Sequence, residues 1–344
     1  MSARSALRES ARSLAPHASM IFVQLSSAGY VVVSRVILTE GISSTVFLVY
    51  QFALAAIFMA ALAFIFERKN RPPLTKSILC WIFLLALIGS TLSQNLLSAC
   101  LYYIPSTLEA AVVNLNPVFT FILSIISMQE NLGINTWWGK GKIFGTLLSV
   151  SGASTLMFWK DSTESLLGTA SLTEWVFGLV MVVLGVLALS TWILLLRPMT
   201  KRYPAECSLT AIMFFFGTLQ TAVIAICTSH EATKWKLHWD LELLNIVCGA
   251  VFYCGLSNLF TTWCAGVKGP IFVASFAPFG LVLTTILEII FLGDTLYLGS
   301  IVGSIMVVLG LYIFLWSKSK EDSCDIMDTM DPLDKDDSTT ALLV

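Results

Sequence analysis

Charge is scarce in this chain. Only 12% of its 344 residues are charged, 56% are hydrophobic, and the mean hydropathy is +0.82. An average soluble domain carries about 25% charged residues. So few charges cannot cover a protein of this size, because much of its exterior would be bare Leu, Val, Ile and Phe. The composition argues against a soluble enzyme and predicts an integral membrane protein whose main partner is the lipid bilayer.

The sequence also lacks the features of nucleic-acid-binding proteins, metalloproteins and enzymes. The net charge is −2 and no basic stripe is present, so we expect no nucleic-acid partner. The eight cysteines lie mostly in apolar runs without a Cys-x-x-Cys pair, and the three histidines are scattered, so we expect neither metal nor cofactor. No Ser-His-Asp grouping, His-Glu-x-x-His run or phosphate-binding glycine loop occurs. We therefore expect no catalytic residues and no enzymatic activity.

Apolar segments long enough to cross a bilayer recur along the chain. A hydrocarbon core of about 30 Å requires roughly 20 apolar residues in a helix. The sequence predicts ten such spans: 17–38, 45–66, 77–99, 105–127, 141–158, 173–196, 207–229, 241–263, 270–292 and 296–316. The fold class expected is thus an all-α integral membrane protein.

The distribution of basic residues tests this count. With the N-terminus in the cytosol, 16 of the 20 Lys and Arg residues fall on the cytosolic side. Positive residues favour that side, which supports an even number of spans and a cytosolic C-terminus. Residues 1–16 are then a basic cytosolic N-terminus, and 317–344 an acidic, disordered cytosolic tail.

The two halves of the chain resemble each other. When Asn114 is aligned with Pro278, Cys100 meets Cys264; after a six-residue shift, Gly145 meets Gly303. Five spans per copy is an odd number, so the second copy must be inverted relative to the first. We expect repeats at 17–158 and 173–316, joined by an extracytosolic loop at 159–172. Inverted repeats are a common transporter plan, with substrate held near the midplane.

Polar side chains within the spans are costly unless they face protein or water. Most of them here are uncharged, and amides and hydroxyls suit a small zwitterion. The predicted substrate-binding residues are Gln94, Asn114, Asn116, Gln24, Gln51, Gln220, Asn258, Thr261 and Ser275. The alternative is that these groups only bond neighbouring helices to one another.

Three charges, Arg35, Glu109 and Glu288, lie towards the outer ends of spans. One interpretation is a gate, or a carboxylate that carries a proton; the other is that all three extend to the membrane interface. Pro117 and Pro278 free backbone carbonyls and are predicted hinges.

Small residues recur at four-residue spacing in two spans. Gly141 and Gly145, and likewise Gly299 and Gly303, place them on one helix face, where backbones can approach closely. We expect these faces to pack within the scaffold or in a homo-oligomer.

Local motifs resemble a known family over about residues 17–318. They include Val33-Ser34-Arg35, Glu67-Arg68-Lys69, Arg71-Pro72-Pro73, Asn116-Pro117, Trp263-Cys264 and Gly269-Pro270. Together they resemble the plant drug/metabolite transporters with EamA-like repeats, called walls-are-thin-related or usually-multiple-acids-move-in-and-out transporters.

The resemblance implies two inverted five-helix EamA-like repeats and bidirectional facilitated movement or export of amino acids. It also implies Gln94 and Asn114 as substrate contacts, and the plasma membrane ahead of the vacuolar membrane. Gln51 departs from the family pattern, in which an arginine commonly follows Tyr50. Auxin or another aromatic metabolite is the second cargo, and a non-transporting membrane scaffold the alternative from another class.

Overall fold

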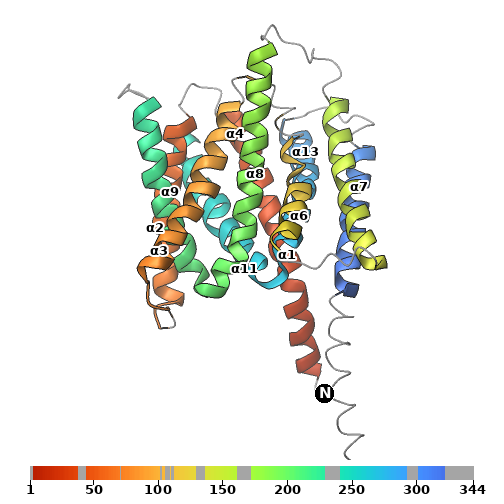
Figure 1. Cartoon of the computed structure of the whole chain (residues 1–344), viewed down its shortest axis with the longest axis horizontal. Helices are drawn as coiled ribbons and strands as arrows, with labels where there is room; N and C mark the ends of the chain where they lie inside the picture. The colour runs from red at the N-terminus through yellow and green to blue at the C-terminus, as the bar shows by residue number, and fades with distance from the viewer. Residues whose placement is uncertain are drawn as a thin grey trace, which may run out of the picture.

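Every regular element in the described part of the chain is a helix (Figure 1). The computed structural model describes residues 3–37, 44–69, 71–100, 103–104, 109, 112–128, 136–160, 172–228, 241–292 and 301–321. The elements are α1 (Ala3–Ile37), α2 (Ser44–Phe66), α3 (Lys76–Ala86), η2 (Leu87–Ser93), α4 (Gln94–Cys100), α6 (Asn116–Ile126), α7 (Trp137–Lys160), α8 (Leu172–Arg202), α9 (Glu206–Thr228), α10 (Leu241–Cys248), η4 (Gly249–Leu256), α11 (Ser257–Lys268), α12 (Pro270–Ser275), α13 (Ala277–Leu292) and the last helix, Ile301–Glu321.

Seven helical stretches are long and apolar enough to cross a bilayer. They are Thr45–Phe66, Lys76–Cys100, Val176–Arg202, Glu206–Cys227, Leu243–Lys268, Pro270–Phe291 and Ile301–Glu321. An all-helical, multi-pass membrane fold is thus confirmed for the described residues. Several boundaries differ from the expected spans: α7 begins at Trp137 instead of 141, α8 ends at Arg202 instead of 196, and α11 ends at Lys268 instead of 263. The described part of the last helix begins at Ile301 and continues to Glu321, and α1 begins at Ala3, so the basic N-terminal segment is helical and projects below the bundle (Figure 1).

Two spans are interrupted next to their prolines. Helix α6 begins at Asn116 with Pro117 in its first turn, and α12 and α13 meet at Phe276. Proline cannot donate a backbone hydrogen bond and its ring displaces the preceding turn. The breaks therefore follow from the residues that the sequence marked as hinges.

Two other spans contain a wide helical turn that the sequence did not reveal. The π-helix η2 joins α3 to α4, and the π-helix η4 joins α10 to α11. Such turns rotate the residues that follow them relative to a regular α-helix, and they are common at functional sites. Both lie next to the central cavity described below.

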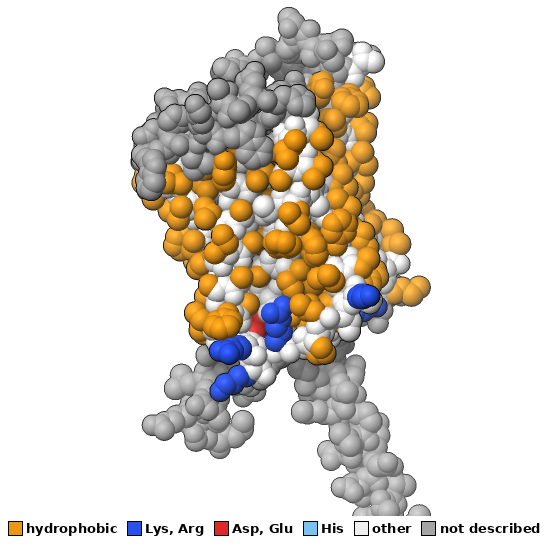
Figure 2. All heavy atoms as spheres, turned by 90° about the vertical axis from the view of Figure 1, so that its left-hand side faces the viewer, with side chains coloured by type: hydrophobic (Ala, Val, Ile, Leu, Met, Phe, Trp, Pro, Cys, Tyr) orange, Lys and Arg blue, Asp and Glu red, His pale blue; other side chains and the backbone are white. Residues whose placement is uncertain are grey.

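The connections α2–α3, α8–α9 and α11–α12 lie at the same end of the bundle as both ends of the described chain (Figure 1). Lysine and arginine side chains gather at this end (Figure 2). Here Glu67 accepts hydrogen bonds from the backbone N–H groups of Cys207 and Ser208, at 2.7 and 2.8 Å, and so satisfies the start of α9. On the face that Figure 2 shows, the described basic side chains therefore lie at one end of the molecule.

The seam between α7 and the last helix is a backbone contact. A Cβ atom on Gly145 would lie 2.7 Å from the carbonyl oxygen of Gly310, and one on Gly152 would lie 2.8 Å from that of Gly303. Any larger residue would push the two helices apart. Near the basic end, buried Lys142 forms an ion pair with Glu321 at 2.7 Å. Gly141 also faces the last helix, at Ser317, whereas Gly299 lies outside the described residues.

Candidate central cavity

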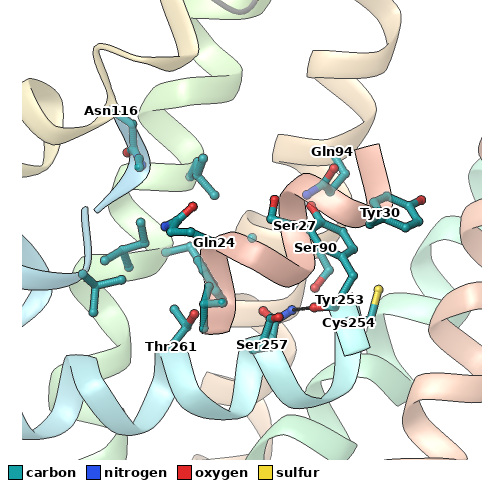
Figure 3. A pocket seen from close by; sticks show the side chains of 18 of the residues that line it. Gln24, Ser27, Tyr30, Ser90, Gln94, Asn116, Tyr253, Cys254, Ser257 and Thr261 are labelled. Carbon is teal, nitrogen blue, oxygen red and sulfur yellow. Dashed lines mark hydrogen bonds between the residues drawn. The ribbon is translucent and has the colours of Figure 1, made fainter. Parts of the chain in front are cut away.

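A cavity of about 240 Å³ lies in the middle of the bundle (Figure 3). Its walls come from both halves of the chain. The lining residues are Met20, Val23, Gln24, Ser27, Tyr30, Leu48, Phe52, Gly89, Ser90, Gln94, Asn116, Leu189, Trp192, Ile193, Phe214, Tyr253, Cys254, Ser257, Asn258, Thr261, Val273, Ala274 and Ala277. Drug-sized ligands occupy pockets of about 300–1,000 Å³, so this cavity suits a smaller solute.

The polar part of the wall is positioned by the two π-helices. Gln94 is the first residue after η2, and Ser257 and Asn258 are the first two after η4. The Gln94 side chain lies close to the Tyr253 hydroxyl. Asn258 Nδ2 donates to the backbone carbonyl of Tyr253 at 3.4 Å. The wide turns thus bring amides from both halves to one cavity.

Asn116 is held in place at the break before α6. Its Oδ1 accepts hydrogen bonds from Ser190 Oγ at 2.7 Å and from Thr120 Oγ1 at 3.2 Å. All three residues are buried. Because these donors fix the orientation of the amide, Asn116 contributes a preset polar group to the cavity wall.

Aromatic rings form the apolar part of the wall. Tyr30 and Tyr253 are stacked, with ring centroids 4.4 Å apart and planes 5° apart. Phe52 and Phe214 are in contact at 5.5 Å between centroids, and Trp192 Nε1 points to Met213 Sδ at 3.4 Å. The cavity therefore offers both ring faces and hydrogen-bonding groups.

The structure brings together five of the nine polar residues that the sequence singled out. Gln24, Gln94, Asn116, Asn258 and Thr261 line the cavity. Several of these are visible in Figure 3, which labels Gln24, Gln94, Asn116 and Thr261.

The other four lie outside the cavity lining. Gln51 accepts a hydrogen bond from the Tyr30 hydroxyl at 3.1 Å, behind the wall. Gln220 accepts from Thr91 Oγ1 at 2.7 Å and donates to the carbonyl of Phe83. Ser275 bonds the carbonyl of Ile271 at 2.8 Å, and Asn114 is buried. Gln51 and Gln220 bond neighbouring helices, as the alternative interpretation expects, whereas Ser275 bonds within its own helix.

No charged side chain of the described residues lines the cavity. Glu109 is partly buried and Glu288 is buried, both outside the lining, and the Arg35 side chain lies outside what the structure describes. No group of three or more potential metal ligands occurs among the described residues. The cavity can therefore bind through hydrogen bonds and ring contacts, without a countercharge.

Sequence reasoning missed Ser27, Ser90, Tyr253 and Ser257, and it also missed the aromatic wall. One signal was present. The 164-residue offset that matches Cys100 with Cys264 also matches Ser93 with Ser257 and Gln94 with Asn258. Applied to every polar residue, this alignment would have paired the two amides that follow the π-helices.

The chain is similar to several plant proteins over most of its length. The model of the EamA-like transporter family matches residues 16–154. A WAT1-related protein of Arabidopsis thaliana is 35% identical over 88% of this chain and 82% of its own length. Protein WALLS ARE THIN 1 of the same plant is 32% identical over 89% of this chain and 83% of its own length, and an auxin-induced protein of Pinus taeda is 35% identical over 89% and 79%.

A solved crystal structure shares the fold, with a TM-score of 0.68 over 87% of this chain and 96% of that chain at 15% identity. The level of identity to the plant proteins, and its extent along both chains, confirm the family resemblance. The chain belongs to the WAT1-related family of EamA-like membrane transporters.

Proposed function

We propose that this protein carries small organic solutes without net charge, foremost amino acids, through the central cavity by alternating access. The observation that carries the proposal is the composition of the wall: amides, hydroxyls and aromatic rings from both halves of the chain surround one space, and none of the described side chains that line it is charged. Amino acids with uncharged side chains are net-neutral zwitterions, whose ammonium and carboxylate groups can form hydrogen bonds with amide oxygens and amide N–H groups.

The proposed architecture is ten spans in two inverted repeats, at 17–158 and 173–316. Its support is a pattern of exchanged contacts. In the two proposed repeats, α1 corresponds to α8, α4 to α11 and α6 to α13. Accordingly, α1 packs on α13 as α8 packs on α6, and α1 packs on α11 as α8 packs on α4. Gly145 meets Gly310 and Gly152 meets Gly303, although Gly145 is the sequence equivalent of Gly303 and Gly152 that of Gly310. A two-fold axis produces such swapped pairs.

Movement in this proposal is a rocking of the two repeats about the cavity, with hinges at Pro117 and Pro278. Both prolines lie where a span is interrupted beside the cavity. Arg35, Glu109 and Glu288 are proposed to act in gating or proton coupling at the outer end. If they do, Glu109→Gln or Glu288→Gln changes the pH dependence of transport; an unchanged rate and pH profile in both variants removes this role.

The proposed placement is the plasma membrane, with the basic end and both termini in the cytosol. The support for the orientation is that lysine and arginine side chains gather at the end where the described chain begins and finishes (Figures 1 and 2). Epitope tags on the two termini test this: both should be reached only after the membrane is permeabilised.

A second cargo class, an indole-type acid such as auxin, is favoured by one observation. Tyr30, Phe52, Trp192, Phe214 and Tyr253 all line the cavity. Aromatic ligands gain from stacked or edge-to-face contacts with such rings, while the amides can bind one carboxylate.

Reconstitution separates these functions. The full-length protein is placed in liposomes, and uptake of radiolabelled glutamine, tryptophan and indole acetate is measured against protein-free liposomes. Saturable flux of glutamine and tryptophan supports amino-acid transport. Flux of indole acetate alone supports the second class. Absence of flux for all three favours a non-transporting scaffold and overturns the proposal.

A further inference from the structure

A second hollow lies on the outside of the bundle, between α2 and α9. Its volume is about 480 Å³, larger than the central cavity. Its floor is made of small residues, Ala56, Ala60 and Ala63 of α2 with Ala211 of α9, and its edges are large apolar side chains. Ile57 and Phe64 on α2 and Phe215 on α9 are more than half exposed. We call this hollow, with the residues that line it, the α2–α9 groove.

The groove runs along the membrane-spanning part of the two helices. From Ile57 to Phe64 it covers about 10 Å, at 1.5 Å per residue. Figure 2 faces the side of the bundle formed by α2, α3 and α9, where hydrophobic side chains cover the wall above the basic end. A surface of this kind at membrane depth can accommodate hydrocarbon chains.

One end of the groove is positively charged. Arg68 and Arg71 both line it. The Arg68 guanidinium lies over the Phe64 ring, 4.8 Å from its centroid, and Arg71 Nε donates to the Tyr203 hydroxyl at 2.9 Å. These contacts hold both cations at the groove, and no ion pair joins either of them to a carboxylate of the described residues.

The nearby acid does not compete for the two arginines. Glu67 directs both carboxylate oxygens to the backbone N–H groups at the start of α9. Next to this cap, Ser208 forms part of the groove wall, is 1% exposed, and its Oγ has no hydrogen-bond partner among the described residues. A buried hydroxyl without a partner is unfavourable, so this side of the groove holds one unsatisfied polar group.

We propose that the α2–α9 groove is a binding site for an anionic glycerophospholipid. The acyl chains lie along the alanine floor, and the phosphate is bound by Arg68 and Arg71. Arginine matches the geometry of phosphate oxygens, and basic pockets between membrane helices bind anionic headgroups at the cytosolic surface. This site is separate from the cavity, and the inference stands whatever solute the protein carries.

A second copy of the chain fits the groove less well. A dimer with its two-fold axis along the membrane normal would place the arginines of both copies at the same depth and face to face. Like charges so arranged repel each other. A lipid phosphate instead brings the opposite charge to this end of the groove.

Native mass spectrometry of the purified full-length protein tests the site. Phosphatidylglycerol and phosphatidylcholine with the same acyl chains are added in separate titrations. We expect the wild type to bind phosphatidylglycerol about tenfold more tightly, because both lipids carry a phosphate anion but the two arginines repel the choline cation of phosphatidylcholine. In the double variant Arg68→Gln/Arg71→Gln this preference should fall to about twofold or less.

Three matched variants control for other causes. Arg202→Gln removes a charge from the same end but outside the groove lining, and it should keep the preference. Tyr203→Phe removes the hydrogen bond to Arg71 but keeps its charge, so the preference should fall less than in the double variant. Ala60→Trp fills the groove at an exposed position, so it should weaken binding of both lipids even if the arginine variant does not fold.

Several results would overturn the proposal. They are equal binding of both lipids by the wild type, a preference that survives the double variant, or a loss of preference as large in Arg202→Gln. A dimer that Ala60→Trp dissociates, without any change in lipid binding, would assign the groove to a second copy instead.

Discussion

At the seam between α7 and the last helix, two backbones touch, whereas around the central cavity large side chains and broken helices keep the backbones apart. The seam relies on glycines that meet carbonyl oxygens. The cavity is built at π-helices and proline breaks, from amides and aromatic rings. Without a hydrophobic driving force between helices in lipid, close packing is what joins them.

The residues of the two regions therefore have different roles: those of the seam hold the fold together, and those of the cavity wall, in the proposed function, contact the solute. A tight backbone contact has a single arrangement, so changes in the seam should affect folding. Side chains around a space can be altered with small effects on the rest of the bundle, so changes in the cavity wall should affect transport at normal protein levels.

The largest effect is expected from Gly145→Leu. The new side chain would overlap the carbonyl of Gly310, and the two helices could not pack. We expect almost no monodisperse protein in fluorescence-detected size-exclusion chromatography. Gly29→Ala is the matched control, because a Cβ at Gly29 meets nothing within 4 Å. A normal peak for Gly145→Leu would mean that the protein folds even when α7 and the last helix are pushed apart.

Next in size is the effect of Glu321→Gln at the basic end of the seam. It leaves the buried Lys142 ammonium without its carboxylate, and breaking a buried ion pair costs about 3–5 kcal/mol. We expect a lower melting temperature of the purified protein. The double variant Lys142→Met/Glu321→Gln should recover most of the loss; if it is as unstable as the single variant, the pair is not the cause.

A smaller effect, confined to transport, is expected from Ser190→Ala. This change removes the shorter hydrogen bond to Asn116 Oδ1, worth about 1 kcal/mol, so KM should rise roughly fivefold. The comparison is Thr191→Ala, whose hydroxyl bonds Leu187 within its own helix. Flux measured over a range of substrate concentrations gives KM for both, and equal values would remove Asn116 from the site.

The smallest effect is expected from Tyr30→Phe, which removes the hydrogen bond to Gln51 and keeps the stacked ring. Flux should change by no more than about fivefold, as the loss of one such bond predicts. Tyr30→Ala, which also removes the ring, should reduce flux further. If both variants transport alike, the stacked pair contributes nothing to the path.

Much of the scaffold could be predicted from the sequence, because it depends on hydropathy and on residues such as proline and glycine, whose effect on a helix is the same in most contexts. The helical spans follow from apolar length, the breaks at Leu115 and Phe276 follow from nearby prolines, and the packing of Gly145 follows from small-residue spacing. These properties are local.

The cavity wall was harder to predict, because it depends on rotation about the helix axis. Gln24 and Gln51 are the same residue type in apolar helices, yet only Gln24 lines the cavity. The π-helices turn Gln94 and Asn258 inward, and nothing in their local composition distinguishes such a turn from regular α-helix. The residues around Ser90 and Tyr253 in the sequence likewise do not indicate that these side chains line the cavity.

The account's central claim is that solute passes through the cavity. The most direct test is uptake of the transported substrate into liposomes by Gln94→Ala and by its neighbour variant Asn95→Ala. Gln94 lines the cavity, whereas Asn95 bonds the carbonyl of Thr91 and does not line it. We predict that Gln94→Ala lowers flux about tenfold or more, as the loss of a specific polar contact would, while Asn95→Ala transports like the wild type. Equal flux in all three proteins would contradict the claim.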